Sequence, residues 1–246
     1  TMPFWTAFWR ALGFKIQLSD LSTRKIYEDG LSAVTSDTVC FPAKLVHGHL
    51  RNLVKKGVDR IFMPSITTVT SENTESTSES MCAIVKGYPI VIRNSDNPEK
   101  RWHIPFDAPL FHWYKREDRN RQLTGYMEKT FGISPAETRQ AINIADAAEK
   151  QFHDEMHQAG KTVLDEVTAN GSYAVVLASR PYQNDALVNH DLPEMFTSLG
   201  IPVLTADSLE EALQLGMKLA GKEDVIVAFG SLSFIGDLTK LSENLE

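Results

Sequence analysis

The residues of this sequence best suited to chemistry are its two cysteines, Cys40 and Cys82. Cys40 lies two residues before Pro42, where a helix is expected to begin, so we expect its sulfur near a helix N-terminus. Unpaired N–H groups at such an end stabilise a thiolate, the form of cysteine that binds metals and attacks electrophiles. The alternative is a buried thiol that packs as a small apolar side chain, and position favours neither outcome.

Cys82 follows a polar segment rich in Ser, Thr and Glu, residues 67–80, and precedes a short helix expected over residues 83–87. The polar segment is predicted to be a mobile loop, with a lid as the alternative. Both cysteines thus follow an expected strand, in a loop that leads towards a helix. In a parallel α/β sheet this edge is where ligands bind. One shared site is compatible with this pattern, and an inert, buried Cys82 is the alternative.

Two histidines, His47 and His49, flank Gly48 on the helix expected after Cys40. Because they are two residues apart they point to different helix faces and do not easily chelate one ion. A zinc site of Cys40, Cys82 and one histidine is conceivable, and so is a cysteine–histidine nucleophile pair. Neither has a specific spacing signature, and both histidines can equally brace the loop.

Arg180 and His190 follow the strand expected over residues 173–178. At a strand end they are suited to bind a phosphate or a carboxylate, although a structural salt bridge explains Arg180 nearly as well. Gly230 and Ser231 form a weaker signal for an anion-binding turn. The sequence contains no P-loop, no Rossmann glycine fingerprint and no Gly-x-Ser-x-Gly elbow. Hydrolysis of ATP by a P-loop mechanism is therefore not expected.

Expected strands and helices alternate along the first half of the chain and must position the two cysteines. Helices are expected over residues 3–12, 22–27 and 42–56, and strands over residues 14–18, 58–63 and 89–93. An irregular or extended segment is expected over residues 101–114. This order predicts a mainly parallel sheet with helices on its faces.

The longest helical stretch begins at Ser134, with Pro135 and Glu137 in its first turn, and its apolar stripe runs to Val167. Such a helix can connect two lobes. We therefore predict an α/β protein of two Rossmann-like lobes, residues 1–130 with both cysteines and residues 131–246. The second lobe is expected to hold strands over residues 173–178, 201–205 and 225–229, and helices over residues 187–199, 208–220 and 234–241.

Composition excludes several classes of protein. The chain has 246 residues and a formal charge of -7, which argues against a nucleic-acid surface. Apolar runs are shorter than the ~20 residues of a membrane helix, and no signal peptide is expected, so we predict a cytoplasmic protein. Two cysteines are too few for a secreted disulfide scaffold. The chain begins inside an expected helix without a preceding strand, so we expect a fragment of a longer protein.

A series of segments resembles one family. The most specific is Val39-Cys40-Phe41-Pro42-Ala43-Lys44, followed by Leu45-Val46-His47-Gly48-His49. The others are Pro3-Phe4-Trp5, Leu12-Gly13-Phe14, Gly57-Val58-Asp59, Ile61-Phe62-Met63-Pro64, Cys82 with Tyr88-Pro89, Phe131-Gly132-Ile133-Ser134, Ser179-Arg180-Pro181-Tyr182, Asn189-His190 and Thr205-Ala206-Asp207-Ser208. In this order they resemble the C-terminal region of activators of (R)-2-hydroxyglutaryl-CoA dehydratase, the CoA-substrate-specific enzyme activases.

The resemblance implies an iron–sulfur function. In longer members this region follows ATPase domains of the actin-like superfamily, and it is similar to the dehydratase subunits that hold a [4Fe-4S] cluster between α/β lobes. By this resemblance, Cys40 and Cys82 stand at the positions of cysteines that bind the cluster in the family. The implied role is low-potential electron transfer in anaerobic metabolism, driven by ATP hydrolysis elsewhere in the full protein. The implied partners are those ATPase domains and a dehydratase-like protein.

The sequence departs from the family pattern in its last part. A further downstream cysteine is absent, and residues 208–241 resemble the C-terminal end of folylpolyglutamate synthases instead. Two cysteines do not complete the ligand set of a [4Fe-4S] cluster, so the chain holds no cluster, shares one across a homodimer, or uses non-protein ligands. Two other functions stay open: a CoA or acyl-CoA binding module around Arg180 and His190, and a structural domain with buried, inert cysteines.

Overall fold

The computed structural model describes residues 2–69, 80–177, 181–205, 212–213 and 216–217. Most of these residues are helical, and the remaining regular structure consists of short parallel strand pairs, so the fold is mixed α/β. The chain divides into two compact units, Thr1–Phe152 and His153–Glu246, which are described one at a time. No helix in the described part of the chain is long and apolar enough to cross a membrane.

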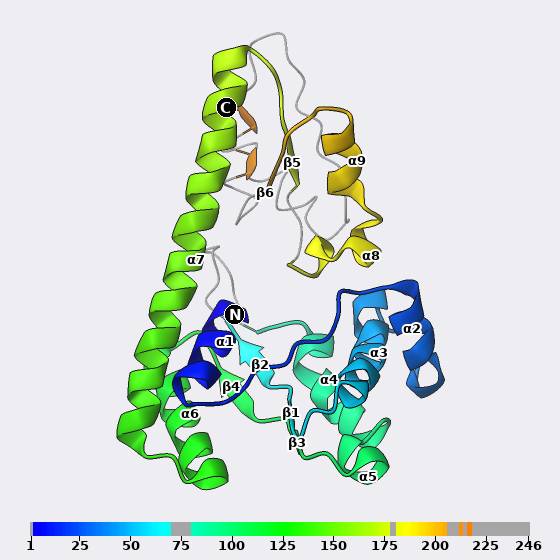
Figure 1. Cartoon of the computed structure of the whole chain (residues 1–246), viewed down its shortest axis with the longest axis vertical. Coiled ribbons are helices and arrows are strands. Elements are labelled where there is room, and N and C mark those ends of the chain that lie inside the picture. The colour runs from blue at the N-terminus through cyan, green and yellow to red at the C-terminus, as the bar shows by residue number, and fades with distance from the viewer. Residues whose placement is uncertain (1, 70–79, 178–180, 206–211, 214–215, 218–246) are drawn as a thin grey trace. The chain divides into compact units, whose positions relative to one another are not determined.

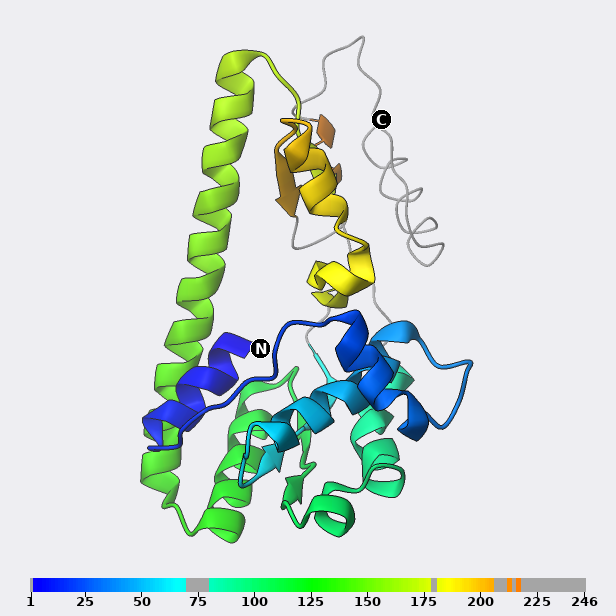
Figure 2. The same ribbon diagram turned by 45° about the vertical axis from the view of Figure 1, so that its right-hand side comes forward.

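The first unit has helices on both sides of a small strand region (Figures 1 and 2). One side holds α1, α6 and the beginning of α7, and the other holds α2 to α5. The helices are α1 (Met2–Ala11), α2 (Arg24–Gly30), the 3-10 helix η1 (Leu31–Ala33), α3 (Phe41–Lys55), α4 (Ala83–Asn94), α5 (Pro98–Trp102), α6 (Arg116–Phe131) and α7 (Pro135–Asn170).

Two strand pairs form one interrupted parallel ladder. The pairs are β1 (Ile61–Phe62) with β3 (Phe106–Asp107) and β2 (Ser65–Thr68) with β4 (Leu110–His112). Backbone hydrogen bonds continue across the break, because Met63 N donates to the Asp107 carbonyl at 2.8 Å and Ser65 N to the Pro109 carbonyl at 2.8 Å. Pro64 and Pro109 have no N–H to donate, which divides the ladder.

The parallel pairing confirms the predicted α/β class, but the predicted Rossmann-like lobes are not seen among the described residues. Each sheet there has two strands. The domains predicted over residues 1–130 and 131–246 stay a prediction. Helix α6 was not predicted from the sequence.

Two predicted strands are wrong. Residues 89–93 lie inside α4, which buries Tyr88, Pro89 and Ile92 at the spacing of one helix face. The carbonyl of Lys86, three residues before Pro89, accepts a hydrogen bond from Ser65 Oγ at 2.8 Å, which ties α4 to β2. Residues 14–18 are extended without pairing to any described strand, because Phe14 and Ile16 pack into the core instead.

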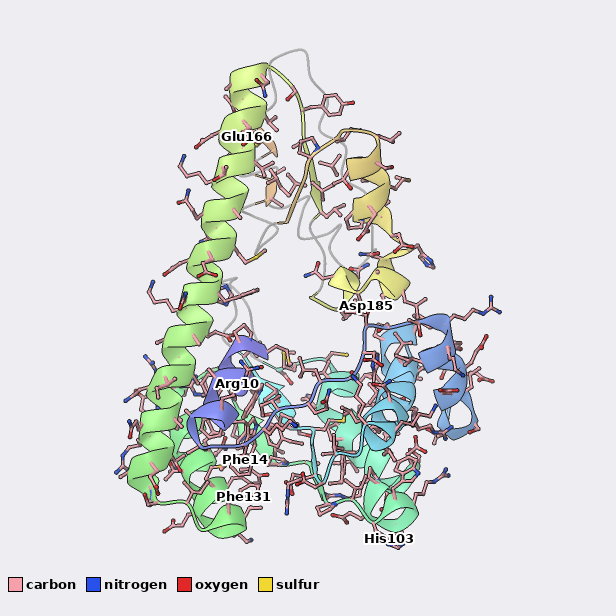
Figure 3. The ribbon with its side chains drawn as sticks, in the orientation of Figure 1. Arg10, Phe14, His103, Phe131, Glu166 and Asp185 are labelled. Carbon is pink, nitrogen blue, oxygen red and sulfur yellow. The ribbon has the colours of Figure 1, made fainter. Side chains whose placement is uncertain are left out.

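An aromatic cluster forms the larger core of the first unit. Helix α1 contributes four of its rings, and edge-to-face pairs such as Phe14 with Phe131, at 5.1 Å between ring centroids, extend it (Figure 3). Its buried members are Phe4, Trp5, Phe8, Trp9, Phe111, Leu123, Met127, Ala141, Ile142 and Ala145. The stripe predicted for the first helix is thus confirmed as a core face.

A second core, the α3–α4 cluster, lies on the other side of the unit. Its buried members are Ala43, Leu50, Ile61, Tyr88, Ile92 and Phe106. Helix α3 begins next to Pro42 and is followed by Gly57 with φ 72°, as the sequence predicts. Helix α2 crosses α3 closely, since a Cβ on Gly48 would lie 1.9 Å from the Ile26 carbonyl oxygen.

The second unit contains the end of α7 and a small parallel pair. The beginning of α7 belongs to the first unit, and its capping box is confirmed: Ser134 N donates to Glu137 Oε2 at 3.1 Å, and Glu137 N donates to Ser134 Oγ at 3.3 Å. Strands β5 (Val175–Leu177) and β6 (Val203–Thr205) lie between the end of α7 and α9 in Figure 1. The segments between these strands are η2 (Pro181–Asn184), α8 (Ala186–Asn189) and α9 (Leu192–Ser198).

The order of strand, helix and strand predicted for residues 173–205 is confirmed. The helix predicted over residues 187–199 is two helices, because His190 and Asp191 have left-handed backbone angles, φ 58° and 56°. Of the helix predicted over residues 208–220, the described residues 212–213 and 216–217 are helical. The strand over residues 225–229, Gly230, Ser231 and the last helix lie outside the described residues, as do residues 70–79 of the predicted loop.

Candidate functional site

Each cysteine is the N-cap residue of a helix. Cys40 caps α3 and Cys82 caps α4, both with extended backbone angles, and their carbonyls accept the first bonds from Ala43 N at 3.0 Å and Lys86 N at 3.1 Å. Both side chains are exposed, and neither forms a disulfide. The position predicted for Cys40 at a helix N-terminus is therefore confirmed, and Cys82 shares it. Helix N-termini stabilise thiolates.

The two capped helices pack against each other. His47 of α3 lies next to Tyr88 of α4, and one turn later Arg51 reaches Asp96, just beyond the end of α4. His47 also reaches Asp96, so α3 packs along α4 over this stretch. Both helices begin on the same side of the first unit in Figures 1 and 2. Cys40 and Cys82 therefore lie at the same end of this helix pair.

A buried polar network lies between α3 and α4. His47 Nδ1 lies 2.9 Å from Asp96 Oδ2, and His47 Nε2 lies 3.1 Å from the Tyr88 hydroxyl. His47 and Asp96 are completely buried, and Tyr88 nearly so. A carboxylate only accepts hydrogen bonds, so Nδ1 donates to Asp96, and in the neutral ring Nε2 accepts from the Tyr88 hydroxyl.

Asp96 is the anchor of this network. Burial by itself raises the pKa of this carboxyl, but the hydrogen bond from His47 and the charge of Arg51 lower it below its usual range. Arg51 Nη2 lies 3.3 Å from Asp96 Oδ1, and Arg101 Nη1 lies 3.5 Å from the same oxygen. Asp96 is thus an ionised carboxylate that is paired on both oxygens, as a buried charge requires.

Tyr88 connects the network to the cysteine end. Burial raises the pKa of Tyr88, and the negative charges of Cys40 and Asp96 raise it further. The phenol therefore stays protonated at neutral pH and can act as a hydrogen-bond donor.

The structure gives the predicted histidines separate places. Both ring nitrogens of His47 are engaged by Asp96 and Tyr88, and the side chain is completely buried, so neither nitrogen is available to a ligand. His49 lies on the face towards α2, where its Nε2 is 3.0 Å from Ser22 Oγ. This separation follows the two-residue spacing, as predicted.

Sequence reasoning did not select Tyr88 and Asp96 as site residues. Asp96 lies between Ser95 and Asn97-Pro98, a composition typical of a turn, and nothing local distinguishes it from an ordinary turn residue. Only its pairing with His47, 49 positions earlier, shows its role.

Two predicted site residues remain, Arg180 and His190. His190 is exposed at the end of α8, and Arg180 lies outside the described residues. Within the described ranges, no group of three or more His, Cys, Asp or Glu side chains is arranged to hold a metal ion. The cysteine end of α3 and α4 is therefore the candidate site.

Comparison with known families decides the chain's membership. Residues 1–209 match the family model described as the CoA enzyme activase uncharacterised domain. This chain belongs to that family. The activase match includes Cys40, Cys82 and the whole Asp96–His47–Tyr88 network, and it ends before most of residues 208–241. A search of curated proteins and a search of solved structures returned no match.

Proposed function

We propose that this activase-family domain is an electron-transfer module whose Cys40 and Cys82 thiolates bind an iron–sulfur cluster. The supporting observation is that both cysteines are exposed N-caps of two helices that pack against each other and begin on the same side of the unit. The alternative of a structural domain with inert cysteines requires buried thiols, and neither thiol is buried.

The donor set suits such a cluster only in part. Iron–sulfur clusters are held by cysteine thiolates, and a [4Fe-4S] cluster takes four protein ligands when they are all cysteines. The chain has two cysteines, and the described residues contain no larger group of metal-binding side chains. In our proposal the other ligands come from a second copy of the chain or are not protein groups.

The side chains around the thiolates have defined tasks in this proposal. The N-terminal ends of α3 and α4 stabilise the negative charge of Cys40 and Cys82. The Asp96–His47 pair holds the Tyr88 hydroxyl in place behind Cys40. A bound cluster would supply a one-electron carrier of low potential.

The cellular setting belongs to the same proposal. We expect a cytoplasmic protein of anaerobic metabolism that works with the ATPase domains of a full-length activator and with a dehydratase-like partner. Membership in the activase family supports this setting.

The test is anaerobic reconstitution of the full chain with iron and sulfide. We expect bound iron and sulfide with a broad absorption band near ~400 nm. A cluster shared by two copies gives about two iron atoms per chain in a dimer, and one cluster per chain gives about four. Cys40→Ala and Cys82→Ala should each abolish the iron and the band.

Met81→Ala is the matched control, because it removes a sulfur-containing side chain next to Cys82 without removing a thiol. It should keep the iron content of the wild type. An iron-free, colourless wild type with intact circular dichroism would contradict the proposal. Equal iron in the wild type and in both cysteine variants would also contradict it.

A further inference from the structure

A cavity of about 380 Å³ lies in the first unit, towards the far end of α3 from Cys40. It is formed where η1, the last turns of α3 and α5 meet. The lining side chains are Ser32, Arg51, Val54, Lys55, Arg101 and Trp102. Three of the six carry a positive charge, and none carries a negative one.

Arg51 is held in a fixed orientation in the cavity wall. Its Nη1 donates to the Asp29 carbonyl, and its Nη2 lies 3.2 Å from Ser32 Oγ and 3.3 Å from Asp96 Oδ1. Its Nε is buried, and in the described part of the chain it has no hydrogen-bond partner. These contacts fix the guanidinium, so its charge stays at the cavity wall.

The neighbouring carboxylates do not neutralise the cavity. Asp96 accepts from Arg51 and Arg101 but also from His47. Asp29 accepts from Lys55 at 2.6 Å and also from Lys25 at 3.3 Å. The three cations Arg51, Lys55 and Arg101 thus face two carboxylates, which leaves one positive charge in excess. Lys25 also pairs with Asp29 and adds to this excess. A site with this surplus and with a fixed guanidinium suits a phosphate group.

The cavity is larger than a phosphate group requires. Its volume lies at the small end of the range of cavities that bind small organic ligands. Val54 and Trp102 give it an apolar wall beside the three cations. An aromatic wall of this kind accommodates a flat ring.

We propose that this cavity binds a phosphate monoester of a small planar molecule. Arg51, Lys55 and Arg101 hold the phosphate, and Trp102 and Val54 contact the ring. This site is separate from the cysteine end, and ligand binding in the cavity does not require a cluster there.

The experiment is calorimetric titration of the full chain at one fixed ionic strength with three probes: inorganic phosphate, adenosine 5′-monophosphate and adenosine. We expect the monophosphate to bind about tenfold more tightly than inorganic phosphate, because it adds the ring contact. Adenosine should bind at least about tenfold more weakly than the monophosphate, because it lacks the charge.

The variants are chosen to keep the fold intact. Arg51 pairs with buried Asp96, so the test uses the more exposed Lys55→Gln and Arg101→Gln, which should each weaken monophosphate binding about tenfold. Arg24→Gln is the control, since Arg24 is almost fully exposed and pairs with Glu28 outside the cavity. Trp102→Ala should remove the advantage of the monophosphate and leave phosphate binding unchanged.

Three results would overturn the proposal. The first is no saturable binding of either phosphate probe by the wild type. The second is an equal loss of binding in Arg24→Gln and Arg101→Gln, which would show a general charge effect. The third is equal affinity for inorganic phosphate and the monophosphate, which would assign the cavity to free phosphate.

Discussion

The aromatic cluster and the α3–α4 cluster of the first unit use buried volume differently. The aromatic cluster buries rings, and the buried charge of Arg119 lies 4.8 Å above the Phe4 ring and pairs with Asp146 at 2.9 Å. The α3–α4 cluster instead encloses His47 and Asp96, both with no exposed surface. Buried ionic networks seldom stabilise more than apolar packing does. The comparison indicates that the first cluster is built mainly from apolar packing, whereas the second retains a buried polar network between α3 and α4.

The largest expected effect breaks the aromatic cluster. Phe8 has no exposed surface, so Phe8→Ala should lower the free energy of unfolding by about 3–5 kcal/mol. Urea unfolding followed by tryptophan fluorescence measures this. Ile90→Ala, which truncates a mostly exposed side chain on α4, is the control. Similar losses in both variants would contradict the assignment of this cluster as the main stabilising core.

Next in size is the loss of the buried carboxylate. Asp96→Ala leaves His47 and Arg51 without their shared partner, so we expect a loss of about 3 kcal/mol. Asp20→Ala removes an exposed carboxylate of the same unit and serves as the control. A loss in Asp96→Ala no larger than in the control would show that the network contributes nothing to the second cluster.

A smaller effect tests how α3 is placed beside α2. In Gly48→Ala the new Cβ would lie 1.9 Å from the Ile26 carbonyl oxygen, so the helices must separate, and we expect a loss of about 1–3 kcal/mol. Gly87→Ala is a matched substitution inside α4, where a Cβ meets no atom within 4 Å. It should stabilise the protein slightly, because alanine favours a helix. Thermal unfolding should therefore shift in opposite directions, and equal shifts would contradict the close crossing.

The smallest effect appears only in acid. The pKa of Asp96 is lower in the folded protein than its usual value of 3.8, so its contribution is complete above that value and is lost as pH falls through the lowered pKa. Asp20 and Asp29 also have lowered pKa values, so the informative quantity is the difference between the wild type and Asp96→Asn. That difference should shrink as pH falls from 5 towards 2. A constant difference would mean that Asp96 is not ionised in the native state.

The features predicted from sequence are those that short-range signals determine. Pro42, Gly57 and the Ser134–Glu137 capping box mark helix ends within a few residues, and α3 and α7 follow them. The place of Cys40 at a helix N-terminus depends on the same kind of signal.

What sequence reasoning missed depends on tertiary contacts. The β-branched residues after Pro89 favour a strand locally, but packing of Tyr88 and Ile92 on one face makes the segment helical. The Asp96–His47–Tyr88 network joins residues more than 40 positions apart, and no local pattern indicates it.

The central claim is that Cys40 and Cys82 act as one site, and the most direct test is phenylarsine oxide binding to the reduced full chain, measured by intact mass. This reagent bridges two neighbouring thiols and does not hold a single one. We predict one adduct per chain, lost in Cys40→Ser and in Cys82→Ser. No adduct, with both thiols alkylated readily by iodoacetamide, would contradict the shared site.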